Sequence, residues 1–326
     1  STPADCRRQR QMCIRDRGCS TADSTLVNDD LLQYVDPFIG TGFHGHTVPG
    51  PSMPYGMVQL SPDTRLNGWD ASSGYHYSDS TIYGFSHTHL SGTGIGDMGD
   101  LLLLPFTGPL PENHERENLP LAVFNHEKEQ ASAGFYSVAF ENYDVSAELT
   151  ASARVGMHRY SFGAGAEKRL LVDVGHILQR TWGHENVWNR LKVIDSLTLQ
   201  GFKHSTGWSH DHQVYFRIEF SSPFSIDRMV SEGIPSDLTD SISGQDIWAF
   251  LSFNELPEGE ALLIKAAISP VDEEGAMKNM QAEIPQMDFD QVRIKAEIAW
   301  REALSKIRIE SEHKDQYTIF YTALYH

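Results

Sequence analysis

The stretch GFSHTHLSGTGIGDMGD, residues 84–100, contains two histidines, two aspartates and five glycines. Such a composition is typical of a metal site, a phosphate loop or a carbohydrate site. His87 and His89 are two residues apart, so on a strand both imidazoles would face the same side. Asp97 or Asp100 could then supply a third zinc ligand. A purely structural alternative is a glycine-rich crossing between strands, with its histidines bonded to nearby backbone.

The metal and phosphate alternatives fit this stretch less well. Zinc hydrolases more often pair histidines four apart on a helix, and the stretch is too rich in glycine for a helix. The segment SGTGIG lacks the lysine and spacing of a P-loop and lacks the full dinucleotide-binding pattern. The carboxylates of Asp97 and Asp100 would also repel a phosphate. The structural and carbohydrate interpretations are the stronger ones.

A carbohydrate site needs an aromatic plane and short polar groups in fixed positions, and the preceding residues offer both. The segment at residues 65–80 supplies Trp69, Asp70, Tyr75, His76, Tyr77 and Asp79. The loop GTGFHGHTVPG adds His44 and His46 on either side of Gly45, where glycines let backbone N–H groups approach a ligand. On loops carried by a rigid sandwich, these residues would be well placed to bind a sugar.

The charge of the chain excludes some partners. Lysine and arginine total 26 against 44 acidic residues, which gives a formal net charge of −18. Such a surface repels nucleic acid and anionic lipid and suits neutral ligands such as sugars, although solubility alone also explains it. No run approaches the roughly 20 apolar residues that a membrane span needs.

The first 28 residues differ in character from the rest. All three cysteines lie there with a cluster of arginines, no histidine is near to complete a metal site, and no apolar signal core is visible. We interpret residues 1–28 as a disordered or non-native tail. The remaining chain has no cysteine, so it offers neither a disulfide nor a thiol nucleophile.

Short apolar runs separated by Pro and Gly, beginning with LLQYVDPFIGTG, indicate strands and turns up to about residue 270. In HQVYFRIEF, Val214, Phe216 and Ile218 alternate with polar residues, as in a strand buried on one face. Ten or more such runs, without a helical pattern between them, predict a mainly β fold with a large antiparallel β-sandwich.

The apolar period becomes helical near Val271 and predicts two helices, in VDEEGAMKNMQAEI and DFDQVRIKAEIAWREALSKI. Asp288 or Asp290 would cap the second helix. Its expected apolar stripe consists of Val292, Ala296, Ala299, Ala303 and Ile307. KDQYTIFYTALYH is a further helical stretch without a closing turn or cap, so we expect the chain to be the front part of a longer protein.

Long motifs from Tyr34 to His326 closely resemble glycoside hydrolase family 92, in the order of that family. They are YVDPFIGTG, GHTVPGPSMPYGMVQLSPDT, SGYHYSDSTIYGFSHTHLSGTG with DMGDLLLLP, ARVGMHRYSF, QVYFRIEFSSPF and EIPQMDFDQVR with FYTALYH. The resemblance implies a calcium-dependent, exo-acting α-mannosidase in which helices join an N-terminal β-sandwich to an (α/α)6 barrel. We therefore expect a sandwich over 29–270, a helical linker over 271–310 and the first residues of a truncated barrel over 311–326.

Members of this family invert the anomeric centre, which requires a general acid and a general base with a water between them. The resemblance places both groups, and most calcium ligands, in the barrel, so no catalytic acid or base is assigned in this sequence. Asp79, Asp97 and Asp100 receive no such role.

The resemblance also implies that the sandwich supplies one wall of the sugar site. By motif match, Trp69 and Asp70 are the first choices for sugar contacts, and the loop at Gly45 and His46 is the second. His87 and His89 either belong to the same rim or brace it from below.

We therefore expect the N-terminal part of an α-mannosidase that trims terminal mannose from N-glycan-like glycans in a periplasmic or extracellular setting. Lacking its catalytic acid and base, the chain would be inactive alone. The alternative is a stand-alone carbohydrate-binding sandwich without catalysis. A zinc hydrolase built on His87 and His89 is a third, weaker hypothesis.

Overall fold

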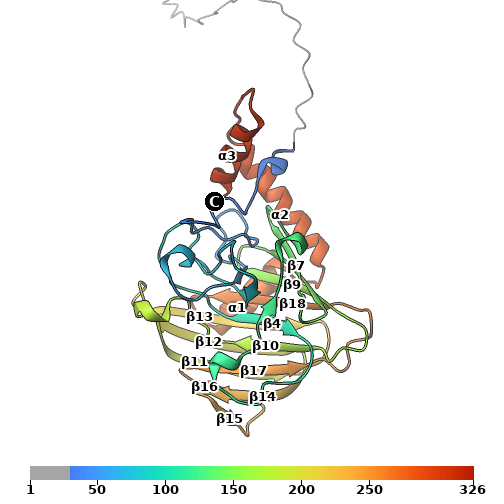
Figure 1. Cartoon of the computed structure of the whole chain (residues 1–326). Helices are drawn as coiled ribbons and strands as arrows, with labels where there is room; N and C mark the ends of the chain where they lie inside the picture. The colour runs from blue at the N-terminus through green and yellow to red at the C-terminus, as the bar shows by residue number, and fades with distance from the viewer. Residues whose placement is uncertain (1–29) are drawn as a thin grey trace, which may run out of the picture. The chain divides into compact units, whose positions relative to one another are not determined.

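The structure is a computed structural model that describes residues 30–326, and the predicted tail at 1–28 lies outside the described residues. Within the described part, two antiparallel sheets face each other across one apolar core to which strands of both contribute (Figure 1). The mainly β sandwich expected from the sequence is confirmed. None of the helices described is both long and apolar enough to span a membrane.

The larger sheet has nine strands in the order β16-β11-β12-β13-β18-β9-β8-β7-β6. Their bounds are β6 Glu129–Ser132, β7 Phe135–Ala139, β8 Val145–Ala151, β9 Val155–Phe162, β11 Glu185–Asp195, β12 Thr198–Thr206, β13 His212–Phe220, β16 Ser241–Gly244 and β18 Leu262–Ser269.

The smaller sheet has seven strands in the order β1-β3-β4-β10-β17-β14-β15, and β2 and β5 form a separate pair. Their bounds are β1 Ser61–Asp63, β2 Thr81–Ile82, β3 Gly84–Ser86, β4 Leu102–Phe106, β5 Ala122–Val123, β10 Arg169–Asp173, β14 Ser225–Ser231, β15 Ile234–Ser236 and β17 Ile247–Ser252. Short 3-10 helices occur at η1 Leu31–Tyr34, η2 Trp69–Ala71, η3 Arg116–Asn118, η4 His126–Lys128 and η5 Arg180–Trp182.

The alternation in the sequence marks the core face of the strands where one face is apolar. In β13, Val214, Phe216 and Ile218 are buried and the residues between them are partly exposed, as predicted. Strand β11 gave no such pattern because only Asn189 and Leu191 on it are buried. The initial run LLQYVDPFIGTG was wrongly assigned to strands. It forms η1 and turns, since its apolar residues pack against helices rather than against a sheet.

Three α-helices follow the sandwich: α1 Glu273–Glu283, α2 Phe289–Leu304 and α3 Lys314–Tyr325. Helix α1 packs on β13 and β18. Asp288 is the N-cap of α2, with its side chain accepting a hydrogen bond from the Gln291 N–H, as predicted. In the predicted apolar stripe of α2, Val292 and Ala296 are buried, and Ala303 is partly buried and packs against the cluster that contains Trp300 and Leu304. Trp300 and Leu304 are also buried, whereas Ile307 lies beyond the end of the helix and is exposed.

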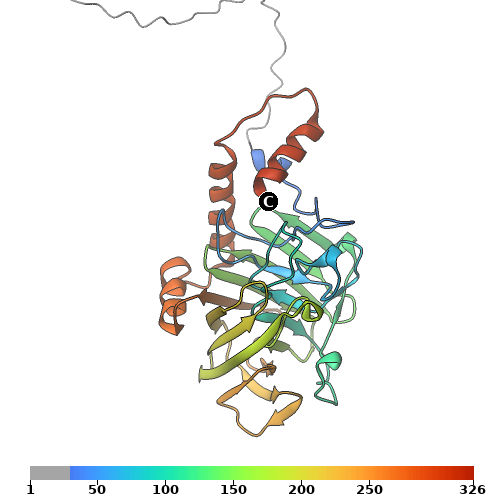
Figure 2. The same ribbon diagram turned by 90° about the vertical axis from the view of Figure 1, so that its left-hand side faces the viewer.

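Helix α3 runs back from the far end of α2 toward the N-terminal loops (Figure 2). Its Thr322 hydroxyl accepts a hydrogen bond of 2.9 Å from the Asp36 N–H. Burial lowers the pKa of the His326 side chain, and the nearby backbone of Pro37 and Ile39 opposes this effect. The last turn of α3 is therefore fixed against the segment that leads into the loop of His44 and His46.

The hairpin between β6 and β7 meets α2 at Gly134, and this contact allows a test of the packing. Gly134 has φ +80°, and a Cβ there would lie 2.7 Å from the Cβ of Ala296. We expect Gly134→Ala to lower the free energy of unfolding by about 1–2 kcal/mol for the left-handed backbone, plus about 1–3 kcal/mol for overpacking against α2. Urea denaturation measures the change.

Gly259→Ala is the matched control, because Gly259 has the same φ of +80° and no atom within 4 Å of its added Cβ. It should show the backbone cost alone. Equal losses in the two variants would show that α2 does not press on this hairpin.

Candidate functional site

The glycine-rich stretch crosses from the end of β3 to the start of β4, and its two histidines are buried. The two side chains bond to different partners. His87 donates from Nδ1 to the Leu101 carbonyl at 2.6 Å, and its Nε2 lies 3.0 Å from Nε2 of His158. The Tyr160 hydroxyl lies 2.7 Å from Nδ1 of His158.

This chain of bonds defines the proton positions. Because a carbonyl only accepts, the proton of His87 is on Nδ1, and its Nε2 accepts from the Nε2–H of His158. The Tyr160 hydroxyl then donates to Nδ1 of His158. Both imidazoles are neutral: burial lowers the pKa of His87 to about 4 and lowers the pKa of His158 well below its usual value.

His89 belongs to a second buried set around Asp63. Its Nδ1 donates to the Gln59 carbonyl at 2.6 Å and its Nε2 to the Asp63 carboxylate at 2.9 Å. His176 donates to the other Asp63 oxygen at 2.8 Å. Burial alone would raise the pKa of Asp63, but the charge of His89 and the hydrogen bonds from both histidines outweigh it and lower that pKa strongly.

The aspartates of the stretch also have structural partners. Asp100 is fully buried, 3.0 Å from the Lys203 ammonium and 2.7 Å from Nε2 of His212. These two partners keep the pKa of Asp100 low against the effect of burial, and Asp100 in turn raises the pKa of His212 against its own burial. Asp97 accepts a hydrogen bond of 2.8 Å from the Ser209 N–H.

These contacts decide between the interpretations of the glycine-rich stretch. His87 and His89 are braces beneath the loops, so the structure does not place them among sugar contacts on the rim. Their nitrogens bond to different residues, and residues 30–326 contain no group of three or more His, Cys, Asp and Glu side chains that could hold a metal. The described residues therefore fit neither the zinc hypothesis nor a calcium site built from such side chains.

The other sequence-predicted residues do come together at the surface. Trp69 begins η2 and is 53% exposed. The ring of His46 lies edge-on to it with centroids 4.5 Å apart, and the ring of His44 is 5.8 Å away. Nδ1 of His44 lies 2.6 Å from the Asp70 carboxylate. We call these four residues, His44, His46, Trp69 and Asp70, the rim cluster.

The rim cluster combines an exposed aromatic face with polar groups of defined protonation. The hydrogen bond from His44 lowers the pKa of Asp70, so this carboxylate is an acceptor at neutral pH. Burial lowers the pKa of His46. Nδ1 of His46 lies 3.2 Å from the Ser72 hydroxyl, and its buried Nε2 has no partner among the described residues.

Two glycines let the loops of the rim cluster approach each other. A Cβ on Gly45 would lie 1.9 Å from the Gly40 carbonyl oxygen, so no other residue fits this turn. A Cβ on Gly94 would meet both His46 and Trp69 at 3.3 to 3.4 Å. Gly45 is thus placed to shape the loop, and Gly94 brings the glycine-rich stretch against the rim cluster.

The remaining aromatic and acidic candidates have other roles. Tyr75 is buried and donates to Glu129, and Tyr77 stacks on the ring of His126 at 4.0 Å. Asp79 accepts hydrogen bonds from Arg65 and Thr64. His76 is buried, with Nε2 3.1 Å from the carbonyl of Phe43. Tyr75 and His76 support the loop from inside and Asp79 is tied to Arg65 and Thr64, whereas Tyr77 is 43% exposed and keeps part of its ring at the surface.

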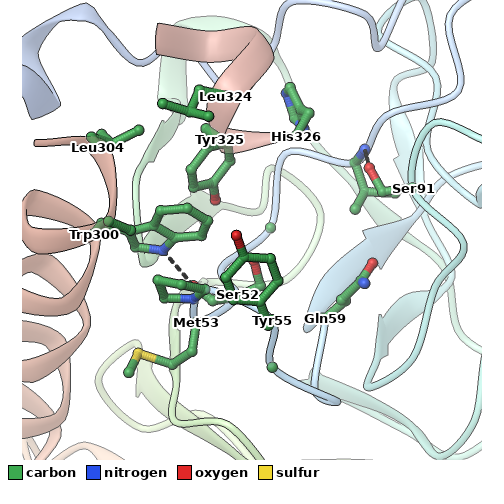
Figure 3. Close-up of a pocket in the computed structure, with 15 residues that line it drawn as sticks. Ser52, Met53, Tyr55, Gln59, Ser91, Trp300, Leu304, Leu324, Tyr325 and His326 are labelled. Carbon is green, nitrogen blue, oxygen red and sulfur yellow. Dashed lines mark hydrogen bonds between the residues drawn. The ribbon is translucent and has the colours of Figure 1, made fainter. Parts of the chain in front are cut away.

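A cavity of about 260 Å³ lies between the loop at residues 48–59 and the ends of α2 and α3 (Figure 3). Trp300 on its wall donates from Nε1 to the Ser52 carbonyl at 2.7 Å. The cavity is smaller than the roughly 300–1,000 Å³ usual for ligand pockets. We interpret it as a gap in the packing of the helices on the loops, next to the rim cluster rather than within it.

Comparison with known proteins identifies the family of the chain. Residues 34–269 match the glycosyl hydrolase family 92 N-terminal domain, and residues 275–326 match the catalytic domain of that family. The chain belongs to glycosyl hydrolase family 92. The predicted family is confirmed, whereas the limits that we assigned to linker and barrel remain predictions.

Solved family 92 structures are close in fold. A family 92 α-mannosidase from Bacteroides thetaiotaomicron is 34% identical with a TM-score of 0.83, over 91% of this chain and 40% of its own. An inverting family 92 mannosidase from the same organism is 27% identical with a TM-score of 0.79, over 91% and 39%. A protein described as an uncharacterized secreted glycosidase of Arthroderma benhamiae is 26% identical, over 86% of this chain and 39% of its length. The chain thus spans about two fifths of these relatives.

Sequence reasoning missed the partners of the buried histidines and two exposed tryptophans. His158, His176 and Lys203 lie far along the chain from the glycine-rich stretch, and nothing in the local sequence pairs them with it. Trp182 and Trp208 had a visible signal, since each stands beside a glycine in a short polar loop where a large apolar residue has no core to fill.

The Asp63 set predicts a strong effect on stability. Asp63→Asn removes the negative charge between two histidines and leaves buried donors unpaired, so it should lower the free energy of unfolding by about 3–5 kcal/mol. Asp211→Asn is the control, because this carboxylate also pairs with a histidine but its side chain is 70% exposed. Urea denaturation at pH 7 should show no change for the control. A similar small change in both variants would contradict the bracing role of Asp63.

The His87 and His158 pair predicts acid sensitivity. Both pKa values are lowered on folding, so the unfolded chain binds more protons below its histidine pKa of about 6.5. Stability from the pair is present above that pH and is lost as pH falls toward about 4, by up to about 1.4 kcal/mol per pH unit for each proton. The raised pKa of His212 acts in the opposite direction.

His158→Gln keeps a donor and an acceptor but removes one titrating ring. The dependence of unfolding free energy on pH between 6.5 and 4 should become shallower, while His204→Gln, on the outer sheet face, should leave it unchanged. An unaltered slope in the His158 variant would show that this pair does not set the acid limit.

Proposed function

We propose that this chain supplies the sandwich wall of the sugar site in an exo-acting, inverting α-mannosidase, which removes terminal mannose from N-glycan-like glycans. The observation that carries the proposal is the rim cluster, in which a half-exposed Trp69 is flanked by His46 and by the paired His44 and Asp70. Family membership and the mannosidases among the similar structures support it. One such relative was solved with mannoimidazole.

The residues of the rim cluster suit a sugar more than other ligands. The face of Trp69 offers an apolar plane for the C–H side of a hexose ring. Asp70 accepts hydrogen bonds from hydroxyls. The net charge of −18 favours a neutral ligand over a phosphate.

The proposal assigns binding and orientation to this chain and no bond-breaking group. Inversion needs an acid and a base on opposite sides of the sugar with room for a water, and both would belong to the remainder of a family 92 protein. Calcium belongs to the same proposal, with most of its ligands in the catalytic barrel of a full-length family 92 protein. The contact of α3 with the segment before His44 supports this division, because it brings residues of the catalytic-domain match against the segment that leads into the loop of His44 and His46.

A periplasmic or extracellular location is part of the proposal. Its support is the secreted relative, together with the neutral glycan that the rim cluster suits. A stand-alone carbohydrate-binding sandwich would use the same rim cluster without hydrolysis. Binding experiments therefore test the sugar site that both hypotheses share.

The test of the proposal is the binding of methyl α-mannoside to this chain, measured by saturation-transfer NMR. Trp69→Ala should weaken binding by on the order of tenfold, since a stacked ring contributes about 0.5–1.5 kcal/mol beyond its buried area. Asp70→Asn should weaken it through loss of a charged acceptor.

Trp188→Ala is the matched control, because Trp188 is 50% exposed on β11 and should leave sugar binding unchanged. If the Trp69 variant bound the mannoside as strongly as the wild type, the rim cluster would not be part of the sugar site.

A further inference from the structure

Three exposed tryptophans lie on loops that meet along the glycine-rich stretch. Trp69, Trp182 and Trp208 are 53%, 46% and 68% exposed. We propose that Trp182 and Trp208 extend the rim cluster into a surface that binds the further sugars of the glycan whose terminal unit lies at Trp69. This inference rests on the proposed function and adds the size of ligand that the site recognises. We call the three residues the tryptophan row.

The row begins where the glycine-rich stretch meets Trp69. A Cβ on Gly94 would lie 3.4 Å from Nε1 of Trp69, so the stretch passes directly beside that ring. Gly92 donates to the His46 carbonyl at 2.7 Å, which fixes the stretch to the other loop of the rim cluster. Ser91 and Thr93 on the same stretch offer hydroxyl groups near this end.

Two residues on, the stretch meets the loop of Trp182. A Cβ on Gly96 would lie 1.9 Å from Cγ of Gln179. The side chain of Gln179 donates from Nε2 to the Gly68 carbonyl at 3.0 Å, next to Trp69. The backbone carbonyl of Gln179 accepts from the Trp182 N–H at 2.9 Å. One residue thus joins the backbones that carry the first two tryptophans.

Gln179 has a left-handed backbone with φ +57°, which a non-glycine residue rarely adopts. Such strain persists only where the surroundings impose it and is concentrated at functional sites. Here the contacts of its side chain impose it, and the result is that η5 presents Trp182 at the surface instead of continuing the buried path of residues 177–178.

One residue further, Asp97 holds the hairpin of Trp208 between β12 and β13. Its carboxylate accepts from the Ser209 N–H at 2.8 Å, and a Cβ on Gly207 would lie 2.7 Å from the same carboxylate. The buried Asp97 is therefore hydrogen-bonded to Ser209 and packed against Gly207, on the two sides of Trp208, whose indole is exposed. Ser209 and His210 follow it as polar neighbours.

The geometry favours one extended ligand. The contacts at Gly94 and Asp97 are three residues apart, so their backbones are separated by at most about 11 Å. Three large exposed aromatic side chains on loops that are all held against such a short stretch exceed what single scattered surface residues explain. A neutral chain of sugars fits them, because each ring offers an apolar face to an indole and hydroxyls to the short polar groups between.

The test compares methyl α-mannoside with an α-linked mannotriose on this chain, by isothermal titration calorimetry. We expect the wild type to bind the trisaccharide about tenfold more tightly than the monosaccharide. Trp182→Ala and Trp208→Ala should each remove most of this gain and leave the affinity for methyl α-mannoside unchanged. Trp208→Phe, which keeps an aromatic plane, should retain most of it.

Trp188→Ala is again the control and should alter neither affinity. Equal affinity of the wild type for both sugars, or an unchanged gain in the Trp182 and Trp208 variants, would overturn the tryptophan row. If Trp69→Ala still weakened both sugars in that case, the proposed function would stand. Absence of binding to either sugar by the wild type would overturn both proposals together.

Discussion

The loops that carry the rim cluster and the glycine-rich stretch depend on one buried carboxylate. Asp63, at the end of β1, receives hydrogen bonds from His89 on the glycine-rich stretch and from His176 after β10. The segments of His89 and His176 are thereby each fixed to one oxygen atom of Asp63. Both nitrogens of His89 face acceptors, so its ring carries two protons and a positive charge against Asp63. Such a buried pair tolerates no loss of a partner, because the remaining charge would be stranded without solvent.

The same principle repeats below the glycine-rich stretch and gives the rim its rigidity. Asp100 joins Lys203 and His212, and the Lys203 ammonium also donates to the His176 carbonyl at 2.6 Å. The two carboxylate sets are therefore connected. Long loops usually move, but these loops have charged braces beneath and glycines that permit close backbone contact above. A sugar site gains from this, since binding groups that are already ordered lose little entropy when a ligand arrives.

The sequence predicted those features that depend on local pattern. Alternation in HQVYFRIEF identified a core strand, and the cap at Asp288 identified the start of α2, because each signal lies within a few residues. Trp69, Asp70 and His46 could be grouped because they lie on two neighbouring loops with a recognisable family motif. His87 and His89 illustrate the limit. Their types suggested chemistry, but only the fold shows that His158 and Asp63 take up their nitrogens.

The proposed function divides sugar binding and bond breaking between two walls of the site. A rim built on braced loops can hold a ring in place, yet inversion needs two carboxyl groups on opposite sides of that ring and a water between them. The carboxylates beneath the loops cannot serve, because Asp63, Asp97 and Asp100 are buried and already bonded within the protein. In the rim cluster, Asp70 is the one carboxylate, and a single carboxylate cannot lie on both sides of a sugar. The proposed function therefore assigns the chemistry to a second wall, and the contact of Thr322 on α3 with the Asp36 N–H, in the segment before His44, is consistent with that wall joining the first there.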